Sequence, residues 1–520
     1  MTDHERDDDI TPAGVDTSLT DGARDGPVPT TPARALTKSE FLVGLQCHRL
    51  LWWRRHDANA VELQPDRVLQ DLFDQGQQVG ALARERFTGG IQIPNDAGRE
   101  ERLQLTEEAM AAGATVIFEG AFEAEGLFVA ADVLRRTEDG WHLLEVKSAS
   151  QLKEEHLPDA AAQAHVLARN GIPPSSIEIM HLNREFRHGT PGDIFARSDV
   201  TASTASISVS VADEVARQLN VLAGPIPEIR IGRHCSEPRP CPFMARCWPQ
   251  DPGHITRLYN VGPAKAESYM AAGIHRIADI PSTQKLPFAA QRQRKSLATG
   301  RVIVEPTLRA ALEPFNVAPL GFLDFETISR AIPVWPAMAP WGQAAAQFSY
   351  HESLPHGGYR HEEHLAEGPQ DARPLVAQRL VEATRNAVKV VTYSAFEKTQ
   401  IRALALAVPD LAAELFELEG KLVDLLPVVR ENVYHPKFMG SFSLKYVLPA
   451  LVPELSYSDL VIVNGLVASV EIARLLFVAD RIPPEERDRV RSDLLAYCER
   501  DTFATVRLIE VLRELAEATT

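Results

Sequence analysis

Four cysteines constrain how this chain folds, because they lie at the two ends of one long stretch. Cys47 stands alone near the start, and Cys235, Cys241 and Cys247 follow at intervals of six residues. Thiolates that meet only after the intervening chain has folded can hold an iron–sulfur cluster of the 4Fe–4S type, as a clasp on that part of the molecule. Zinc is the alternative, because a tetrahedron of thiolates suits both metals. The fifth cysteine, Cys498, lies elsewhere in the chain.

The length of the chain indicates several domains, since 520 residues exceed what one hydrophobic core supports. Alternating helical and strand-like segments predict an α/β multidomain protein. We expect a disordered acidic tail at residues 1–34, a first α/β domain at 35–250, a connector at 251–315 and a second α/β domain at 316–520. The tail holds eight Asp or Glu against three Lys or Arg among Thr, Pro and Gly, a mixture that buries too little apolar surface to fold.

Charge and apolar patterning limit the surroundings and partners of the protein. No positively charged start is followed by an apolar run, and the most apolar late window is broken by Asn464, Glu471 and Arg474. We therefore expect a cytoplasmic protein with no membrane segment. The net charge of −17 argues against a general attraction to nucleic acid, because phosphate binding depends on positive surface.

The connector contains a glycine turn between two predicted short helices. Residues 258–263 lead into the first, and Ala272–Gly273–Ile274 leads into a second that ends near Asp279. Backbone amides in such a turn can meet a phosphate, so the pattern resembles a helix-hairpin-helix. A plain αα-hairpin linker fits the same residues.

A first group of charged residues lies between the cysteines. Glu145 and Lys147 are two residues apart in a predicted strand and share one face, and Asp132 joins them if residues 128–134 form a hairpin with residues 142–147. Asp139–Gly140 supplies the turn signal for that hairpin. Two such carboxylates can hold Mg²⁺ or Mn²⁺, and the lysine can steady an attacking water or a phosphate charge. Glu145 and Lys147 also fit a simple ion pair on an exposed strand, with no catalytic role.

With Gln163 on the next predicted helix and the four flanking cysteines, this group resembles the iron–sulfur branch of the RecB-like PD-(D/E)xK nucleases, over residues 36–249. The resemblance implies that Asp132 and Glu145 bind metal, that Lys147 assists, and that Gln163 orients water or a base. Members of that branch often carry a histidine on an early helix, and residues 76–80 offer none. Metal binding is then weaker, or this domain binds nucleic acid without cutting it.

A second acidic group begins in a predicted buried strand at residues 320–326. Asp324 and Glu326 alternate with Phe325, so both carboxylates share one face, where burial without a cation costs several kcal/mol. Tyr497 and Asp501 are one turn apart on a predicted final helix and can address the same centre. Metal is the simplest explanation for this pattern.

The order of these residues resembles the tyrosine type of DEDD exonucleases, in the RNase H-like group. The middle motif of that group carries an aspartate where residues 393–397 end in Glu397, and Asp424 is a competing or auxiliary acid. The resemblance implies that Asp324, Glu326, Glu397 and Asp501 bind metal and that Tyr497 positions water. The whole chain, down to Ser-Phe-Ser-Leu-Lys-Tyr at residues 441–446, also resembles an uncharacterised bacterial family of the domain of unknown function 2779 type that joins the two modules.

Together these features predict a metal-dependent nuclease acting on single-stranded DNA or DNA ends, in repair or defence. Two alternatives stay open: a nucleic-acid-binding scaffold with degenerate sites, and an exonuclease that trims RNA, because no residue visibly reads the 2′-hydroxyl.

Overall fold

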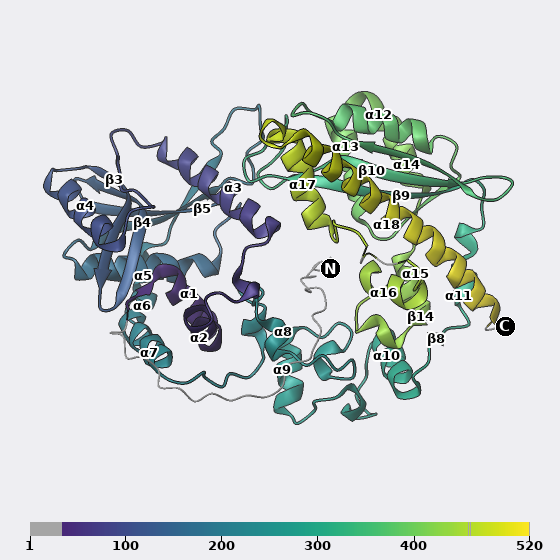
Figure 1. Cartoon of the computed structure of the whole chain (residues 1–520), viewed down its shortest axis with the longest axis horizontal. Helices are drawn as coiled ribbons and strands as arrows, with labels where there is room; N and C mark the ends of the chain where they lie inside the picture. Colours follow the sequence, from purple (N-terminus) through teal and green to yellow (C-terminus); the bar gives the residue numbers. More distant parts are fainter. Residues whose placement is uncertain (1–33, 456, 458, 519–520) are drawn as a thin grey trace.

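The computed structural model describes residues 34–455, 457 and 459–518, and the predicted tail therefore lies almost wholly outside the described residues. A first half (residues 34–250) and a second half (316–518) each contain a mixed β-sheet with helices, and a connector (251–315) runs between them (Figure 1). This mixed α/β architecture agrees with the fold class expected from the sequence. In the part of the chain that is described, no helix is both long and apolar enough to cross a membrane.

The first half is built on a sheet of order β2-β3-β4-β5-β6-β7, with β1 paired to β4. Its strands are β1 (Leu36–Thr37), β2 (Ile91–Gln92), β3 (Val116–Ala124), β4 (Leu127–Thr137), β5 (Gly140–Lys147), β6 (Pro174–Leu182) and β7 (Phe195–Asp199). Its helices are α1 (Lys38–Gln46), α2 (His48–His56), α3 (Arg67–Arg84), α4 (Arg99–Ala111), α5 (Leu157–Arg169), α6 (Thr201–Ser208) and α7 (Val211–Ala223).

The predicted hairpin is confirmed: β4 and β5 pair antiparallel, and Thr137 lies opposite Gly140. Gly140 has a φ of 123°, a left-handed conformation that glycine adopts without strain. Helix α5 then crosses over to β6, which lies parallel to β5. The crossover brings the first turns of α5 against the sheet beside the end of β5.

Both faces of this sheet are covered. On one face, Val129, Ala131 and Leu143 pack with Phe41 and Leu167 from the helices α1 and α5. On the other, α3 supplies Val79 and Ala83 to a core that also takes in Ala331 from the second half. The first half is therefore a sheet between helical layers, and α3 lies on the side that meets the second half.

The connector differs from the prediction in one respect. Helix α9 (Pro263–Ala271) forms as expected and ends before Gly273, whose φ is 78°, but the next element is only a 3₁₀ turn, η5 (Ile277–Asp279). The expectation of a second helix there was wrong, because the segment closes with Pro281 and helix α10 (Phe288–Thr299) begins only after it. The other short elements are α8 (Met244–Cys247), β8 (Ile303–Val304) and α11 (Leu308–Ala311).

The second half contains a sheet of order β11-β10-β9-β12-β13. Its strands are β9 (Leu320–Ser329), β10 (Gln343–Ser353), β11 (Tyr359–Leu365), β12 (Lys389–Thr392) and β13 (Leu422–Asp424), with β14 (Val433–Tyr434) paired to β8. Its helices are α12 (Arg373–Thr384), α13 (Phe396–Ala407), α14 (Ala412–Lys421), α15 (Leu426–Asn432), α16 (Leu444–Leu451), α17 (Gly465–Phe477) and α18 (Pro484–Ala518).

Strand β9 is the centre of this sheet. It pairs antiparallel with β10 and parallel with β12. Leu323 and Phe325 enter the core shared with α12 and α13. Because side chains alternate along a strand, Phe322 shares the opposite face with Asp324 and Glu326, and it packs with the C-terminal part of α18. The two carboxylates therefore point toward the face that α18 crosses.

The two halves contact each other through the connection between β9 and β10. The backbone N–H of Ala331 donates to Gln75 of α3 at 2.6 Å, and Arg330 pairs with Asp71 at 2.7 Å. The indole N–H of Trp341 donates to the carbonyl oxygen of Ser148 at 2.6 Å. This connection reaches the first half directly after Lys147, the last residue of β5.

One prediction concerns the close packing at the start of β9. A Cβ added to Gly321 would lie 2.5 Å from the hydroxyl of buried Tyr350. We expect Gly321→Ala to destabilise the protein by about 1–3 kcal/mol, because the ring has no room to move in a filled core. Thermal and denaturant unfolding measure the loss. Gly420→Ala is the matched control, since nothing lies within 4 Å of its added Cβ and alanine favours its helix. Equal behaviour of the two variants would contradict the packing argument.

Candidate active site

The second half brings together carboxylates from three elements far apart in the sequence. We call Asp324, Glu326, Glu397 and Asp501 the second acidic cluster. Asp324 and Glu326 come from β9, Glu397 from the first turn of α13, and Asp501 from the middle of α18. One oxygen each of Asp324, Glu326 and Asp501 lies within 4.8 Å of the others. Glu397 is not part of that closest group, but its charge acts on both Asp324 and Glu326.

Burial and mutual repulsion raise the pKa values of the carboxyl groups in this cluster, so these groups tend to stay protonated. Burial, and then the carboxylates of Asp501 and Glu326, raise the pKa of Asp324 well above its usual range. Burial, followed by Asp501 and Glu397, does the same for Glu326. Burial raises the pKa of Glu397 to about 8. The strongest charges acting on Asp324 and Glu326 are thus other carboxylates, an arrangement that a divalent cation relieves.

One oxygen of the cluster has no partner within the described protein. Glu397 is 4% exposed, and its Oε2 atom makes no hydrogen bond. A buried polar atom of this kind is costly unless something else binds it. Because carboxylate oxygens are the ligands that Mg²⁺ and Mn²⁺ prefer, the donor set of the second acidic cluster fits these ions.

The hydroxyl groups of two tyrosines interact with the carboxylate of Asp501. Burial raises the pKa of Asp501 to about 6, and the hydroxyls of Tyr457 and Tyr497 act in the opposite direction. Tyr457 donates a hydrogen bond to Asp501, a contact that no sequence motif indicated. Burial and then Asp501 raise the pKa of Tyr497 well above its usual range, so Tyr497 is a phenol that can orient a water molecule. Cys498 lies 3.5 Å from Asp324 Oδ2.

Asp424, named from the sequence as a competing or auxiliary acid, and Lys445 take supporting positions near the second acidic cluster. Asp424 accepts a hydrogen bond from the backbone N–H of Leu426 at 2.9 Å at the start of α15, and its charge adds to the effect of burial on the pKa of Glu397. The charge of Lys445 lowers the pKa of Asp501, against the larger effect of burial. Lys445 is therefore a cation on the Asp501 side of the cluster.

The first half also gathers carboxylates. We call Asp132, Glu145 and Asp159 the first acidic cluster. Asp132 accepts a hydrogen bond from the backbone N–H of Val146 at 2.7 Å, so β4 and β5 bring it beside Glu145 as predicted. Lys147 donates to Glu145 at 2.7 Å, and Gln163 donates to Glu145 at 2.6 Å. The four residues selected from the sequence, Asp132, Glu145, Lys147 and Gln163, thus share one network.

Asp159 and Lys38 complete this network and were missed. Asp159 lies one helical turn before Gln163 on α5, and that spacing was the available signal. Lys38 follows β1, which pairs with β4, and no motif indicated it. Its ammonium lies 2.9 Å from Glu145 and 3.1 Å from Asp159. The first acidic cluster therefore holds two lysines among its carboxylates.

The pKa shifts separate the two clusters. Burial, and then Asp132, raise the pKa of Glu145 to about 7. Burial also disfavours the Asp159 charge, but Lys38 and Lys147 outweigh it and hold the pKa of Asp159 far below its usual range. Two lysines thus contact the carboxylates of the first cluster, whereas the leading charges acting on Asp324 and Glu326 in the second are those of other carboxylates.

The four predicted cysteine ligands line one cavity. Cys47 lies between α1 and α2, Cys235 in a 3₁₀ turn, and Cys247 at the end of α8. The backbone N–H of Cys241 donates to the carbonyl of Cys235 at 2.8 Å. All four are free thiols, and burial raises the pKa of Cys241 to about 12. Thiols are the donors that both iron–sulfur clusters and zinc take, and all four of these line the same cavity.

Comparison with known proteins gives one family match. A family model described as a domain of unknown function (DUF2779) matches residues 321–443, from β9 to the residue before α16. The resemblance to the domain of unknown function 2779 is confirmed for that stretch. No curated protein matches the chain. The solved structure named "Crystal structure of SSO0001" is 11% identical, covers 41% of this chain and 86% of its own, and aligns with a TM-score of 0.20. A score that low carries no argument.

The protonation of Glu397 predicts how stability depends on pH. Its pKa is about 8 in the folded protein against an ordinary value of 4.5, so the folded state binds a proton that the unfolded state releases. Without metal, this group's contribution therefore falls as pH rises from about 4.5 to 8. We expect a loss in Tm on the order of a few degrees across that window, reduced by Mn²⁺ and by Glu397→Gln. Glu414→Gln, at an exposed position of α14, should leave the pH profile unchanged.

Proposed function

We propose that this protein is a metal-dependent nuclease, a hydrolase of phosphodiester bonds, whose cutting centre is the second acidic cluster. The observation that carries the proposal is the convergence of buried Glu326 and half-buried Asp324 and Asp501 within 4.8 Å, beside the Glu397 Oε2 atom that makes no hydrogen bond in the described protein. Maintaining these charges together is costly in a folded protein unless cations bind them. Sites of this composition suit two-metal hydrolysis of phosphate esters.

The finer assignment is a DEDD exonuclease with an RNase H-like fold. Its support is a five-stranded sheet in which β9, β10 and β11 are antiparallel while β12 and β13 run parallel to β9. Further support comes from the order of the acids along the chain and from Tyr497, one helical turn before Asp501. The family match at residues 321–443 names no activity. We therefore assign 3′–5′ exonuclease activity on these residues alone.

The roles of the residues follow from their positions. Asp324, Glu326, Glu397 and Asp501 would hold Mg²⁺ or Mn²⁺, which when bound supplies positive charge for the phosphate and acidifies the attacking water. Tyr497 keeps its proton and points its hydroxyl at the Asp501 side, where it orients that water. Tyr457 fixes the Asp501 carboxylate by a hydrogen bond.

The first half is proposed as a RecB-like PD-(D/E)xK module clasped by a 4Fe–4S cluster on Cys47, Cys235, Cys241 and Cys247, with zinc as the alternative. Asp132 and Glu145 would bind metal there, and Lys147 and Gln163 would assist. The ion pairs of Lys38 with Glu145 and Asp159 favour a second candidate for this half, namely binding of nucleic acid without cutting. In that reading the first half delivers a strand and the second half shortens it.

Single-stranded DNA or DNA ends are the proposed substrate, in DNA repair or defence in the cytoplasm. RNA is the alternative polymer, because the residues of the second acidic cluster address the phosphate and not the sugar. Matched DNA and RNA strands of one sequence, labelled at the 5′ end, distinguish the two.

The central test compares variants in one degradation assay. With Mg²⁺ or Mn²⁺, we expect Asp324→Ala to slow the shortening of a 5′-labelled single strand by about 100-fold or more, since losing a metal ligand costs at least as much as losing an outer partner. Lys147→Ala should retain that activity if the first half only binds. Asp410→Ala, at an exposed position, is the control. A strand that is bound but never shortened by wild type would identify a scaffold and contradict the proposal.

A separate prediction concerns Lys38, one of the two lysines in the first acidic cluster. Lys38→Met leaves Glu145 and Asp159 short of a cation, so we expect a loss of about 1–3 kcal/mol without metal. Mn²⁺ should then raise the Tm of the variant more than that of wild type, because the ion takes the place of the ammonium. Lys153→Met is the control, as its side chain is 51% exposed and pairs only with Glu155 among the ion pairs described. An equal rise in Tm with Mn²⁺ in wild type and both variants would show that the ion does not take the place of the Lys38 ammonium.

A further inference from the structure

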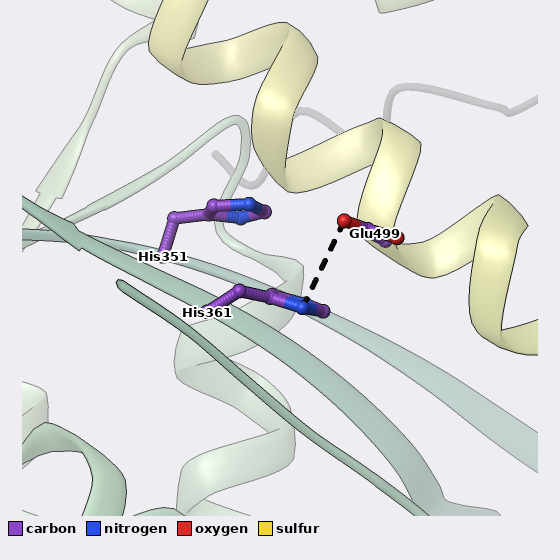
Figure 2. Close-up of side chains that lie close together, drawn as sticks. All are labelled: His351, His361 and Glu499. Carbon is purple, nitrogen blue, oxygen red and sulfur yellow. Dashed lines mark ion pairs between the residues drawn. The ribbon is translucent and has the colours of Figure 1, made fainter. Parts of the chain in front are cut away.

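Two histidines and a glutamate meet on the second sheet, outside both acidic clusters. His351 of β10 and His361 of β11 lie directly opposite each other, and their rings stack with centroids 4.4 Å apart. Glu499 reaches them from α18 (Figure 2). One ligand atom from each side chain lies within 4.8 Å of the others. The three residues therefore converge from two strands and a helix.

One consistent set of proton positions satisfies the chain of hydrogen bonds around the two histidines. The hydroxyl of Thr502 donates to the backbone carbonyl of Glu499 at 3.0 Å, so its oxygen accepts from His351 Nδ1 at 2.8 Å and from Ser349 at 2.8 Å. Because the Ser349 hydroxyl donates its single proton to Thr502, its oxygen accepts a hydrogen bond from His361 Nε2 at 2.9 Å. Both hydrogen-bonded nitrogens are donors, and the lone pairs stand on His351 Nε2 and His361 Nδ1.

The groups that face one another in this cluster are thus all acceptors. His361 Nδ1 lies 3.8 Å from Glu499 Oε1, too far for a hydrogen bond and with no proton between them in the neutral ring. Burial, and then His361, lower the pKa of His351 to about 4, which keeps that ring uncharged at neutral pH. A second ring nitrogen that donates to a protein oxygen is the usual support of a metal-binding histidine.

We propose that His351 Nε2, His361 Nδ1 and a carboxylate oxygen of Glu499 bind a late first-row transition-metal ion, with Zn²⁺ as the representative. Imidazole nitrogens with one carboxylate suit such ions, whereas the carboxylates of the second acidic cluster suit Mg²⁺ or Mn²⁺. The two rings stack with their planes 24° apart, so binding one ion at both of them requires the more exposed His361 side chain to turn.

The position of the site gives it a structural consequence. Glu499 lies on α18 between Tyr497 and Asp501. An ion at this site ties the edge of the sheet to the helix that supplies the second acidic cluster. The inference stands on the convergence of the three side chains and does not depend on any nuclease activity.

Zinc counting on the full chain tests the proposal. Each protein is stripped with EDTA, desalted, dialysed against micromolar Zn²⁺, and its zinc per chain is measured by atomic emission. We expect His361→Ala and Glu499→Gln each to bind one equivalent less than wild type. Both side chains are partly exposed, so both variants should fold, and circular dichroism checks this.

Two controls distinguish this site from the others. His364→Ala changes a histidine on the opposite face of β11, and Asp324→Asn changes the second acidic cluster; both should keep the equivalent that the test variants lose. If folded His361→Ala and Glu499→Gln bind as much zinc as wild type, the site does not exist. If Asp324→Asn loses the same equivalent as they do, the ion belongs to the acidic cluster and the proposal is equally wrong.

Discussion

Repulsion between buried carboxylates is the interaction around which the second half is arranged. Asp324 and Glu326 occupy the central strand of the sheet, where neighbouring strands and helices cover most of their surface, and α18 adds Asp501 to the same space. Charges of one sign at such distances are not stabilised by the protein alone. The fold keeps them together because β9 and α18 are anchored by apolar side chains above and below the cluster, such as Phe322 and Leu494.

The negative charge of the grouped carboxylates is neutralised differently in the two acidic clusters. In the first, Lys38 and Lys147 supply positive charge from the chain itself, and one carboxyl, that of Asp159, stays ionised with its pKa far below the usual range. In the second, the nearest charges around Asp324 are carboxylates, so neutrality comes from protons or from ions taken from solution. Similar residue types therefore give one site that is internally balanced and one that depends on its surroundings.

Local patterns predicted the elements that carry both clusters. Alternation along β9, the Asp139–Gly140 turn, and the spacing of Tyr497 and Asp501 all follow from short-range geometry, and the structure forms the hairpin, the buried strand and the long helix. The contributions of Lys38 and Tyr457 could not be predicted, because each depends on a pairing between distant segments: β1 with β4, and the segment before α17 with α18. The prediction of a second helix in the connector was wrong for a local reason, since the residues after Gly273 form only a single 3₁₀ turn.

The connection between β9 and β10 links the two halves close to both clusters. It leaves β9 shortly after Glu326, donates hydrogen bonds to Asp71 and Gln75 of α3, and returns through Trp341, whose indole N–H donates to the carbonyl of Ser148, the residue after Lys147. A hinge motion that separated the halves would have to break these bonds first. The clusters thus lie on segments of the chain that are hydrogen-bonded to each other, so a displacement of this connection acts on the elements that carry both of them.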